Sequence, residues 1–174
     1  MLKGGADLAA PKPLAEGFSA DGYIIDQDCF SSVRYRTMPA SINGCGWIAA
    51  FDLLHFLSGT EDWDSVRRAL DEGHRIRMPG PTMLPVMRSY LLAQIPELQE
   101  VRGREKALAA ASRSRAGIFH YREEKTPHFV FYYRTEKGFR FFNVADGLED
   151  GVMPMEKFGE EHLKGGLVVL FFLV

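Results

Sequence analysis

The sequence is poor in cysteine and contains no long apolar run. Only two cysteines, Cys29 and Cys45, occur in 174 residues, which excludes a scaffold stapled by several disulfides and leaves one Cys29–Cys45 disulfide as an alternative. The longest apolar run, residues 167–174, is far shorter than the roughly 20 residues of a membrane-spanning helix. No apolar stretch follows Met1, so no signal peptide is predicted. We therefore expect a cytoplasmic protein with reduced thiols and no membrane partner.

An excess of charge of one sign is also missing. The formal net charge is −2 at pH 7, and basic residues alternate with acidic ones outside a cluster in residues 102–115. A protein that binds nucleic acid normally has a stronger basic bias, so no nucleic-acid partner is expected. The thiols and imidazoles form no Cys-x-x-Cys or His-x-x-x-His pair, so the sequence predicts no metal site, and we expect no cofactor.

Apolar residues, in contrast, are plentiful. They make up 46% of the chain, which is enough to bury the core of one domain. Residues 1–22, rich in Gly, Ala and Pro, are interpreted as an N-terminal arm, and residues 23–174 as a single domain. Helical patterns dominate at about 45–115 and strand patterns at about 116–174. The sequence thus predicts an α+β fold in which an N-terminal helical part packs on an antiparallel sheet.

The expected elements follow from periodicity and from Gly, Pro and capping residues. Helices are predicted over residues 45–57, over 61–72 with Thr60 as a cap, from a Thr82 cap to about 93, within 97–115, and over 154–163. Strands are predicted over residues 23–25, 117–121, 129–134 and 139–144, and over 167–173. The last strand is apolar on both faces, so we expect it inside the sheet.

Cys45 stands at the junction between a glycine-containing turn and an apolar helical pattern. The N–H groups and the dipole at a helix start both favour the thiolate over the thiol. Gly44 and Gly46 leave room for another backbone or a substrate carbonyl to approach. Such a cysteine is either a nucleophile or a small buried apolar residue, and this stretch alone leaves both interpretations open.

A histidine and an amide are placed to support the first interpretation. His128 opens one predicted strand and Asn143 lies late in the next, so a turn at residues 136–138 makes them cross-strand neighbours. This is the geometry of a histidine base oriented by a second polar group. Asp146 is the rival orienter, although Asp-Gly is also an ordinary turn pair. His120, in the preceding strand, is interpreted as structural.

These segments resemble a known family. NGCGWIAA at residues 43–50, PHFV at 127–130 and FFNV at 141–144 are similar to the papain-like cysteine peptidase superfamily. Within it, the compact bacterial members similar to the bacteriocin-leader-processing peptidases are nearest. The resemblance covers roughly residues 41–146 and includes the chain order Cys, His, Asn.

The resemblance implies a papain-like fold with an active-site cleft between the helical part and the sheet. It further implies that Cys45 is the nucleophile, that His128 is the general base and acid, and that Asn143 orients His128. In that superfamily a glutamine several residues before the cysteine usually donates to the oxyanion, and here that region holds none. Gln27, the one upstream glutamine, is far away in sequence. Asn43 is the candidate donor beside the Cys45 N–H, or else a helix cap.

The expected activity is therefore cleavage of a peptide or amide bond through a thioester. The same triad serves thiol acyltransferases similar to transglutaminases, and a catalytically inactive papain-like binding protein is the other alternative. A peptide or protein is the expected substrate and partner. The N-terminal arm, at residues 11–22, has the length and extended course to occupy the cleft as an inhibitory strand.

Overall fold

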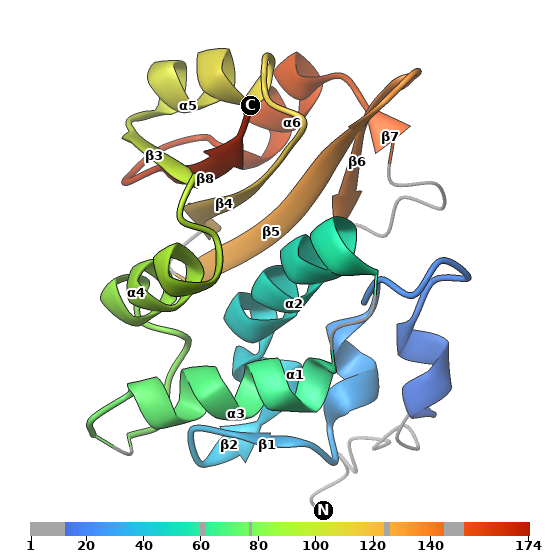
Figure 1. Cartoon of the computed structure of the whole chain (residues 1–174), viewed down its shortest axis with the longest axis vertical. Coiled ribbons are helices and arrows are strands. Elements are labelled where there is room, and N and C mark those ends of the chain that lie inside the picture. The colour runs from blue at the N-terminus through green and yellow to red at the C-terminus, as the bar shows by residue number, and fades with distance from the viewer. Residues whose placement is uncertain (1–12, 60–61, 77, 124–125, 145–151) are drawn as a thin grey trace, which may run out of the picture.

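The computed structural model describes residues 13–59, 62–76, 78–123, 126–144 and 152–174. The chain first forms a helical part and then an antiparallel sheet with two further helices (Figure 1). The predicted α+β class and the order of its two parts are confirmed. Both cysteines are free thiols, so the alternative Cys29–Cys45 disulfide is not formed. No helix of the described ranges is long and apolar enough to cross a membrane.

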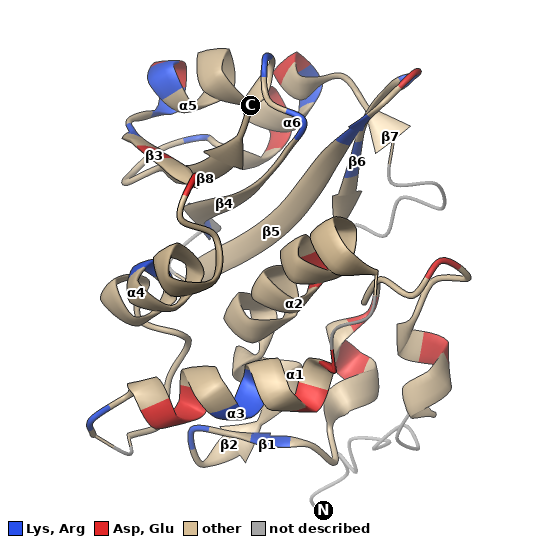
Figure 2. Cartoon of the chain, viewed as in Figure 1, with Lys and Arg blue, Asp and Glu red and all other residues tan. Residues whose placement is uncertain are grey.

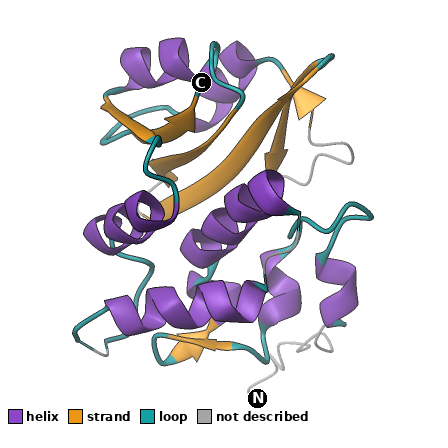
Figure 3. Cartoon of the chain, viewed as in Figure 1, coloured by secondary structure: helices purple, strands orange, loops and turns teal. Residues whose placement is uncertain are grey.

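Helices make up most of the first part and cover the sheet of the second (Figure 3). The helices are η1 (Leu14–Gly17), η2 (Gln27–Phe30), α1 (Ala40–Asn43), α2 (Cys45–Ser58), α3 (Trp63–Gly73), α4 (Leu84–Gln94), α5 (Arg104–Ala111) and α6 (Met155–His162). The central helix is α2, whose first ten residues are all buried. Its one acidic residue is Asp52, and Figure 2 shows red for acidic residues on the ribbon of α2.

The strands form a small ribbon and one large sheet. They are β1 (Arg34–Tyr35), β2 (Met38–Pro39), β3 (Gln99–Arg102), β4 (Ala116–Glu123), β5 (Thr126–Thr135), β6 (Gly138–Phe142), β7 (Val152–Met153) and β8 (Val169–Leu173). The large sheet has the order β3-β8-β4-β5-β6-β7, and its described pairs are antiparallel. As predicted, β8 lies inside this sheet with all of its residues buried.

Apolar side chains on the two faces of the sheet form two cores. On one face, Phe129, Phe131 and Phe171 pack with the residues of α2. On the other face, Tyr121 and Tyr132 belong to a cluster with residues of α5 and α6. Because side chains alternate along a strand, neighbouring residues of β4 and β5 serve different cores. This alternation decides which histidine faces α2.

Three local predictions were wrong. The first concerns the stretch 97–102: the helix predicted within residues 97–115 is confirmed as α5, but the strand β3 that precedes it was not predicted, because Gln99 to Arg102 pair with the last strand, a contact distant in sequence. The strand expected at residues 23–25 is reduced to a bridge between Phe18 and Ile24. Thr82 is not the cap of α4, because the Thr82 hydroxyl hydrogen-bonds to the Tyr35 hydroxyl. The helix begins after Met83 instead.

The described end of the N-terminal arm packs on the helical part. The rings of Phe18 and Phe30 lie edge to face with centroids 5.7 Å apart. The Asp21 carbonyl oxygen lies 2.9 Å from Nε2 of His55 near the end of α2, and the Asp21 carboxylate pairs with Arg140 of β6 at 2.6 Å. Residues 1–12 of the arm lie outside the described residues, so its predicted inhibitory role stays a prediction.

Candidate functional site

Cys45 begins the central helix. The short helix α1 ends at Asn43, Gly44 makes the break, and α2 starts at Cys45, whose side chain is buried. A Cβ added to Gly44 would lie 2.5 Å from the Ala40 carbonyl oxygen, so the break needs glycine. The predicted helix start at Cys45 is confirmed, and with it the position of the thiol at the amino end of a helix of 14 residues.

His128 and Asn143 are brought together, but through the main chain of Asn143. Nε2 of His128 lies 2.9 Å from the Asn143 carbonyl oxygen. A carbonyl oxygen only accepts, so Nε2 carries the hydrogen, and a neutral ring then leaves Nδ1 without a proton. Asn143 follows the last residue of β6 with φ at 58°, a left-handed conformation that asparagine tolerates. That conformation turns its carbonyl toward the histidine.

The Asn143 side chain has a different partner, Gln27. Its Nδ2 donates to Oε1 of Gln27 at 3.0 Å, and Nε2 of Gln27 donates to the Ser41 carbonyl oxygen at 2.9 Å. Ser41 is in α1, one turn before Cys45. A chain of three hydrogen bonds thus joins His128 on the sheet to the turn that carries the thiol. The contacts of Gln27 in space, not its place in the sequence, bring it to this turn.

Gln27 retains one hydrogen-bond donor beside this turn. An amide nitrogen carries two hydrogens, and among the described residues only the hydrogen bond to Ser41 is made. Gln27 opens η2, whose preceding residue, Asp26, accepts from the Asp28 N–H and so caps the turn. The sequence indicated little about Gln27 beyond its being the one glutamine upstream of Cys45. The fold brings it next to Ser41, close to Cys45.

The Asn43 amide is used within the fold. Its Nδ2 donates to the carbonyl oxygens of Tyr35 and Gly80, at 2.9 Å each, so both hydrogens have partners. Its Oδ1, which only accepts, is buried without a partner. Asn43 therefore holds the loop at residues 79–83 against the start of α2. This contradicts the prediction that its side chain donates to an oxyanion.

The two histidines of the sheet occupy different environments. His128 pairs with Tyr121, a member of the core formed with α5 and α6, so it lies on that face of the sheet, and the two rings meet edge to face at 5.7 Å. His120 pairs with Phe129, so it lies on the α2 face of the sheet. Burial is the main reason that the pKa of His120 falls to about 4, with Arg122 and His128 contributing. His120 is thus neutral near pH 7.

The other expected residues are assigned as follows. Asp146, the rival orienter, lies outside the described residues. His55 of α2 packs its ring against Phe51 and Tyr23. Across the ranges that the structure describes, no group of three or more His, Cys, Asp or Glu side chains could hold a metal ion. Among the described residues, hydrogen bonds connect His128, Asn143 and Gln27 to Ser41, which lies one turn before Cys45.

No protein-family model and no curated protein matches the chain. Among solved structures, it is similar to the peptidase domain of Streptococcus ComA, described as a bifunctional ABC transporter involved in a quorum-sensing pathway. The two share 12% sequence identity, the match covers 76% of this chain and 93% of that chain, and the TM-score is 0.44. A likeness of this size does not establish a family, so the function is inferred from the residues of the site.

Proposed function

We propose that the protein is a cysteine peptidase or amidase of papain-like fold that cleaves a peptide or amide bond through a thioester. The observation that carries the proposal is the chain of hydrogen bonds from His128 through Asn143 and Gln27 to Ser41, one turn before Cys45. A purely structural cysteine needs no oriented histidine and no amide with a spare donor. The resemblance of the three sequence segments to papain-like peptidases supports the same assignment.

In the proposed reaction, Nδ1 of His128 takes the proton of the Cys45 thiol, for which the His128 ring turns toward the start of α2 from the sheet face that it shares with Tyr121. Because Nε2 is already engaged by the Asn143 carbonyl, the ring is held in the tautomer that can accept this proton. The thiolate attacks the substrate carbonyl, and His128 then protonates the leaving amine. Water attacks the thioester, the acid is released, and the thiol is restored.

Gln27 is the proposed oxyanion donor, in place of Asn43. Its remaining N–H and the Cys45 backbone N–H form the pair of donors that a tetrahedral oxyanion requires. The contact from Asn143 to Oε1 fixes which end of the amide is the oxygen and so directs the nitrogen toward α1. Losing one such donor typically costs about 10²- to 10³-fold in rate.

The first test is the pH dependence of alkylation by iodoacetamide, followed by peptide mass spectrometry. An ordinary thiol reacts in proportion to its ionisation near pH 8.5, whereas a thiol paired with an imidazolium reacts well below that. We expect Cys45 to react rapidly at pH 6 and His128→Ala to restore ordinary behaviour, with Cys29 as the internal control. His120→Ala is the matched control and is expected to leave the profile unchanged.

The second test separates nucleophile activation from oxyanion binding. Gln27→Ala is expected to leave the alkylation profile of Cys45 intact and to lower kcat/KM about 10²- to 10³-fold on a quenched fluorescent peptide library. Ordinary Cys45 reactivity in the wild type, or activation that depends on His120 instead of His128, contradicts the proposed function. Activated Cys45 without cleavage of the library, but with transfer to an added amine, points to an acyltransferase.

A further inference from the structure

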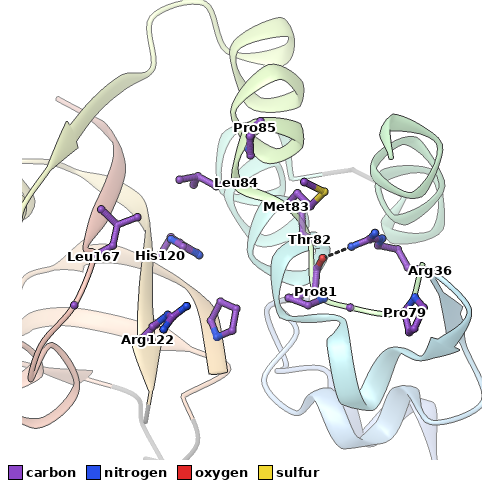
Figure 4. Close-up of a pocket in the computed structure, with 13 residues that line it drawn as sticks. Arg36, Pro79, Pro81, Thr82, Met83, Leu84, Pro85, His120, Arg122 and Leu167 are labelled. Carbon is purple, nitrogen blue, oxygen red and sulfur yellow. Dashed lines mark hydrogen bonds between the residues drawn. The ribbon is translucent and has the colours of Figure 1, made fainter. Parts of the chain in front are cut away.

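A groove separates the helical part from the sheet beside the proposed site. It has a volume of about 560 Å³, which is within the usual range for ligand sites of about 300–1,000 Å³. Figure 4 shows Thr82, Met83 and Leu84 on one wall and His120 and Leu167 on the other. Most of its lining is apolar, and prolines supply much of it. Met83 and Leu167 are about half exposed at 52% and 51%, so apolar surface is open there to an incoming chain.

Thr82, which lines the groove, packs against the start of α2. A Cβ added to Gly46 would lie 2.2 Å from Oγ1 of Thr82, so the groove wall packs directly on the residue that follows Cys45. A substrate whose carbonyl reaches the thiol therefore passes the groove with its neighbouring residues.

This wall is held in place by several hydrogen bonds from the helical part. Asn43 donates to the Gly80 carbonyl, Arg36 donates to the Pro81 carbonyl at 2.6 Å, and the Tyr35 and Thr82 hydroxyls lie 2.7 Å apart. The Met83 N–H donates to Nε2 of His74 at 3.1 Å. A site held by this many contacts is preorganised, which lowers the entropic cost of binding.

His120 is the unusual member of the lining. It stands on the α2 face of the sheet, and in Figure 4 its ring points from β4 toward the opposite wall. Within the described residues it makes no hydrogen bond, and its Nδ1 is buried without a partner. A neutral imidazole has one donor and one acceptor, and buried polar atoms in proteins are normally satisfied. A bound ligand would supply the hydrogen-bond partner that the His120 ring lacks among the described residues.

We propose that this groove binds a substrate side chain with an apolar body and a hydrogen-bonding tip, as tyrosine has, and that His120 binds the tip. The proposal rests on the proposed function, because it takes Cys45 as the reacting thiol. It makes His120 a specificity-determining residue and revises its interpretation as structural.

The chemistry of the lining favours this class of side chain over others. Apolar walls suit an aromatic ring, and the tip of tyrosine can donate to or accept from His120. A lysine or arginine would meet Arg122 at the same groove, and that like charge disfavours it. Phenylalanine would fill the groove but leave His120 unpaired. One neutral hydrogen bond corresponds to about 3- to 10-fold in affinity, which sets the expected preference for tyrosine over phenylalanine.

Peptidyl chloromethyl ketones test this without knowledge of the natural substrate. Each probe is a three-residue peptide of glycine with one Tyr or one Phe at the first, second or third position from the reactive carbon. The second-order rate of Cys45 alkylation is measured and divided by the iodoacetamide rate of the same variant. At one position we expect the Tyr probe to react about 3- to 10-fold faster than the Phe probe.

Variants of His120 test whether this residue causes the preference for tyrosine over phenylalanine. His120→Phe is expected to bring the Tyr/Phe ratio to about 1, and His120→Gln, which keeps a hydrogen-bonding tip, to retain part of it. Because each probe rate is divided by the iodoacetamide rate of the same variant, a change in the intrinsic reactivity of Cys45 does not alter the Tyr/Phe ratio. His120→Leu replaces His120→Phe if the melting temperature shows that the larger ring unfolds the protein.

The outcomes separate the two proposals. Normal iodoacetamide activation with no Tyr preference at any position, or with a preference that survives His120→Phe, overturns this inference alone. Iodoacetamide reactivity of Cys45 that is ordinary and independent of His128 overturns the proposed function, and this inference with it.

Discussion

At the scale of single residues, Asn143 makes one hydrogen bond through its backbone and another through its side chain. Its carbonyl accepts from His128, while its amide donates to Gln27. A residue with φ at 58° can do this only because asparagine is tolerated in the left-handed region. The expectation that Asn143 orients His128 thus has geometric support, but the oxygen involved belongs to the main chain.

The two roles of Asn143 are separable by substitution. Asn143→Gly keeps the carbonyl and adopts the same φ without strain, so the alkylation profile of Cys45 is expected to stay activated. Asn143→Val disfavours that φ by roughly 1–2 kcal/mol, so the carbonyl should move and the activation should fall. Thermal melting and alkylation against pH measure both effects. Loss of activation in Asn143→Gly as complete as in His128→Ala would show that the side chain is the orienter.

At the scale of elements, the loop between α3 and α4 depends on a neutral histidine. Nδ1 of His74 lies 2.6 Å from the Leu70 carbonyl, so it donates, and Nε2 must then be the acceptor for the Met83 N–H. Burial is the main cause that lowers the pKa of His74, with the Leu70 contact opposing it. Protonation at Nε2 would remove the acceptor that ties the start of α4 to the end of α3.

The stability of this connection should therefore decline in acid. A histidine with a lowered folded-state pKa contributes its full stability above its unfolded pKa, near 6.5, and loses that contribution as pH falls through its folded pKa. His74→Gln, which keeps one donor and one acceptor, is expected to be about 1 kcal/mol less stable at pH 7 and to lose less between pH 7 and 5. Urea unfolding at several pH values measures this. An identical pH dependence in both proteins would contradict it.

At the scale of the whole molecule, Asp52 links the N-terminal segment to the core. This fully buried carboxyl of α2 accepts the Ile24 N–H through Oδ1 at 2.8 Å, and its Oδ2 has no partner. The adjoining Tyr23 ring packs on Phe131 and Phe142 of the sheet. Segment, helix and sheet therefore meet around one buried acid, and burial raises its pKa well above the usual range.

The sign of the pH effect for Asp52 is opposite to that for His74. A raised folded-state pKa contributes stability below the unfolded pKa, near 3.9, and that contribution is lost as pH rises through the folded pKa. Asp52→Asn keeps an acceptor for Ile24 and cannot ionise, so we expect it to be more stable than the wild type by roughly 1–3 kcal/mol at pH 8. The difference should shrink toward pH 4. Global urea unfolding of both proteins checks this, and a difference independent of pH would contradict it.

Much of the framework was predictable because it depends on local patterns. The apolar periodicity after Cys45 marked the central helix, and aromatic runs separated by turn residues marked β4, β5 and β6. The neighbouring positions of His128 and Asn143 followed from a short turn between two strands. β3 and the hydrogen bond between Gln27 and Asn143 were not predictable, since each depends on a partner far away in the sequence.

Local sequence patterns were sufficient to predict the class of the fold, the position of Cys45 at a helix start and the pairing of the strands around His128 and Asn143. These follow from side-chain periodicity and turn chemistry, which act over a few residues. Three features depend on tertiary packing: Gln27 approaches α1, the Asn43 amide donates to the carbonyls of Tyr35 and Gly80, and His120 faces a groove. Those outcomes depend on how two layers pack, and packing joins residues that no local pattern relates.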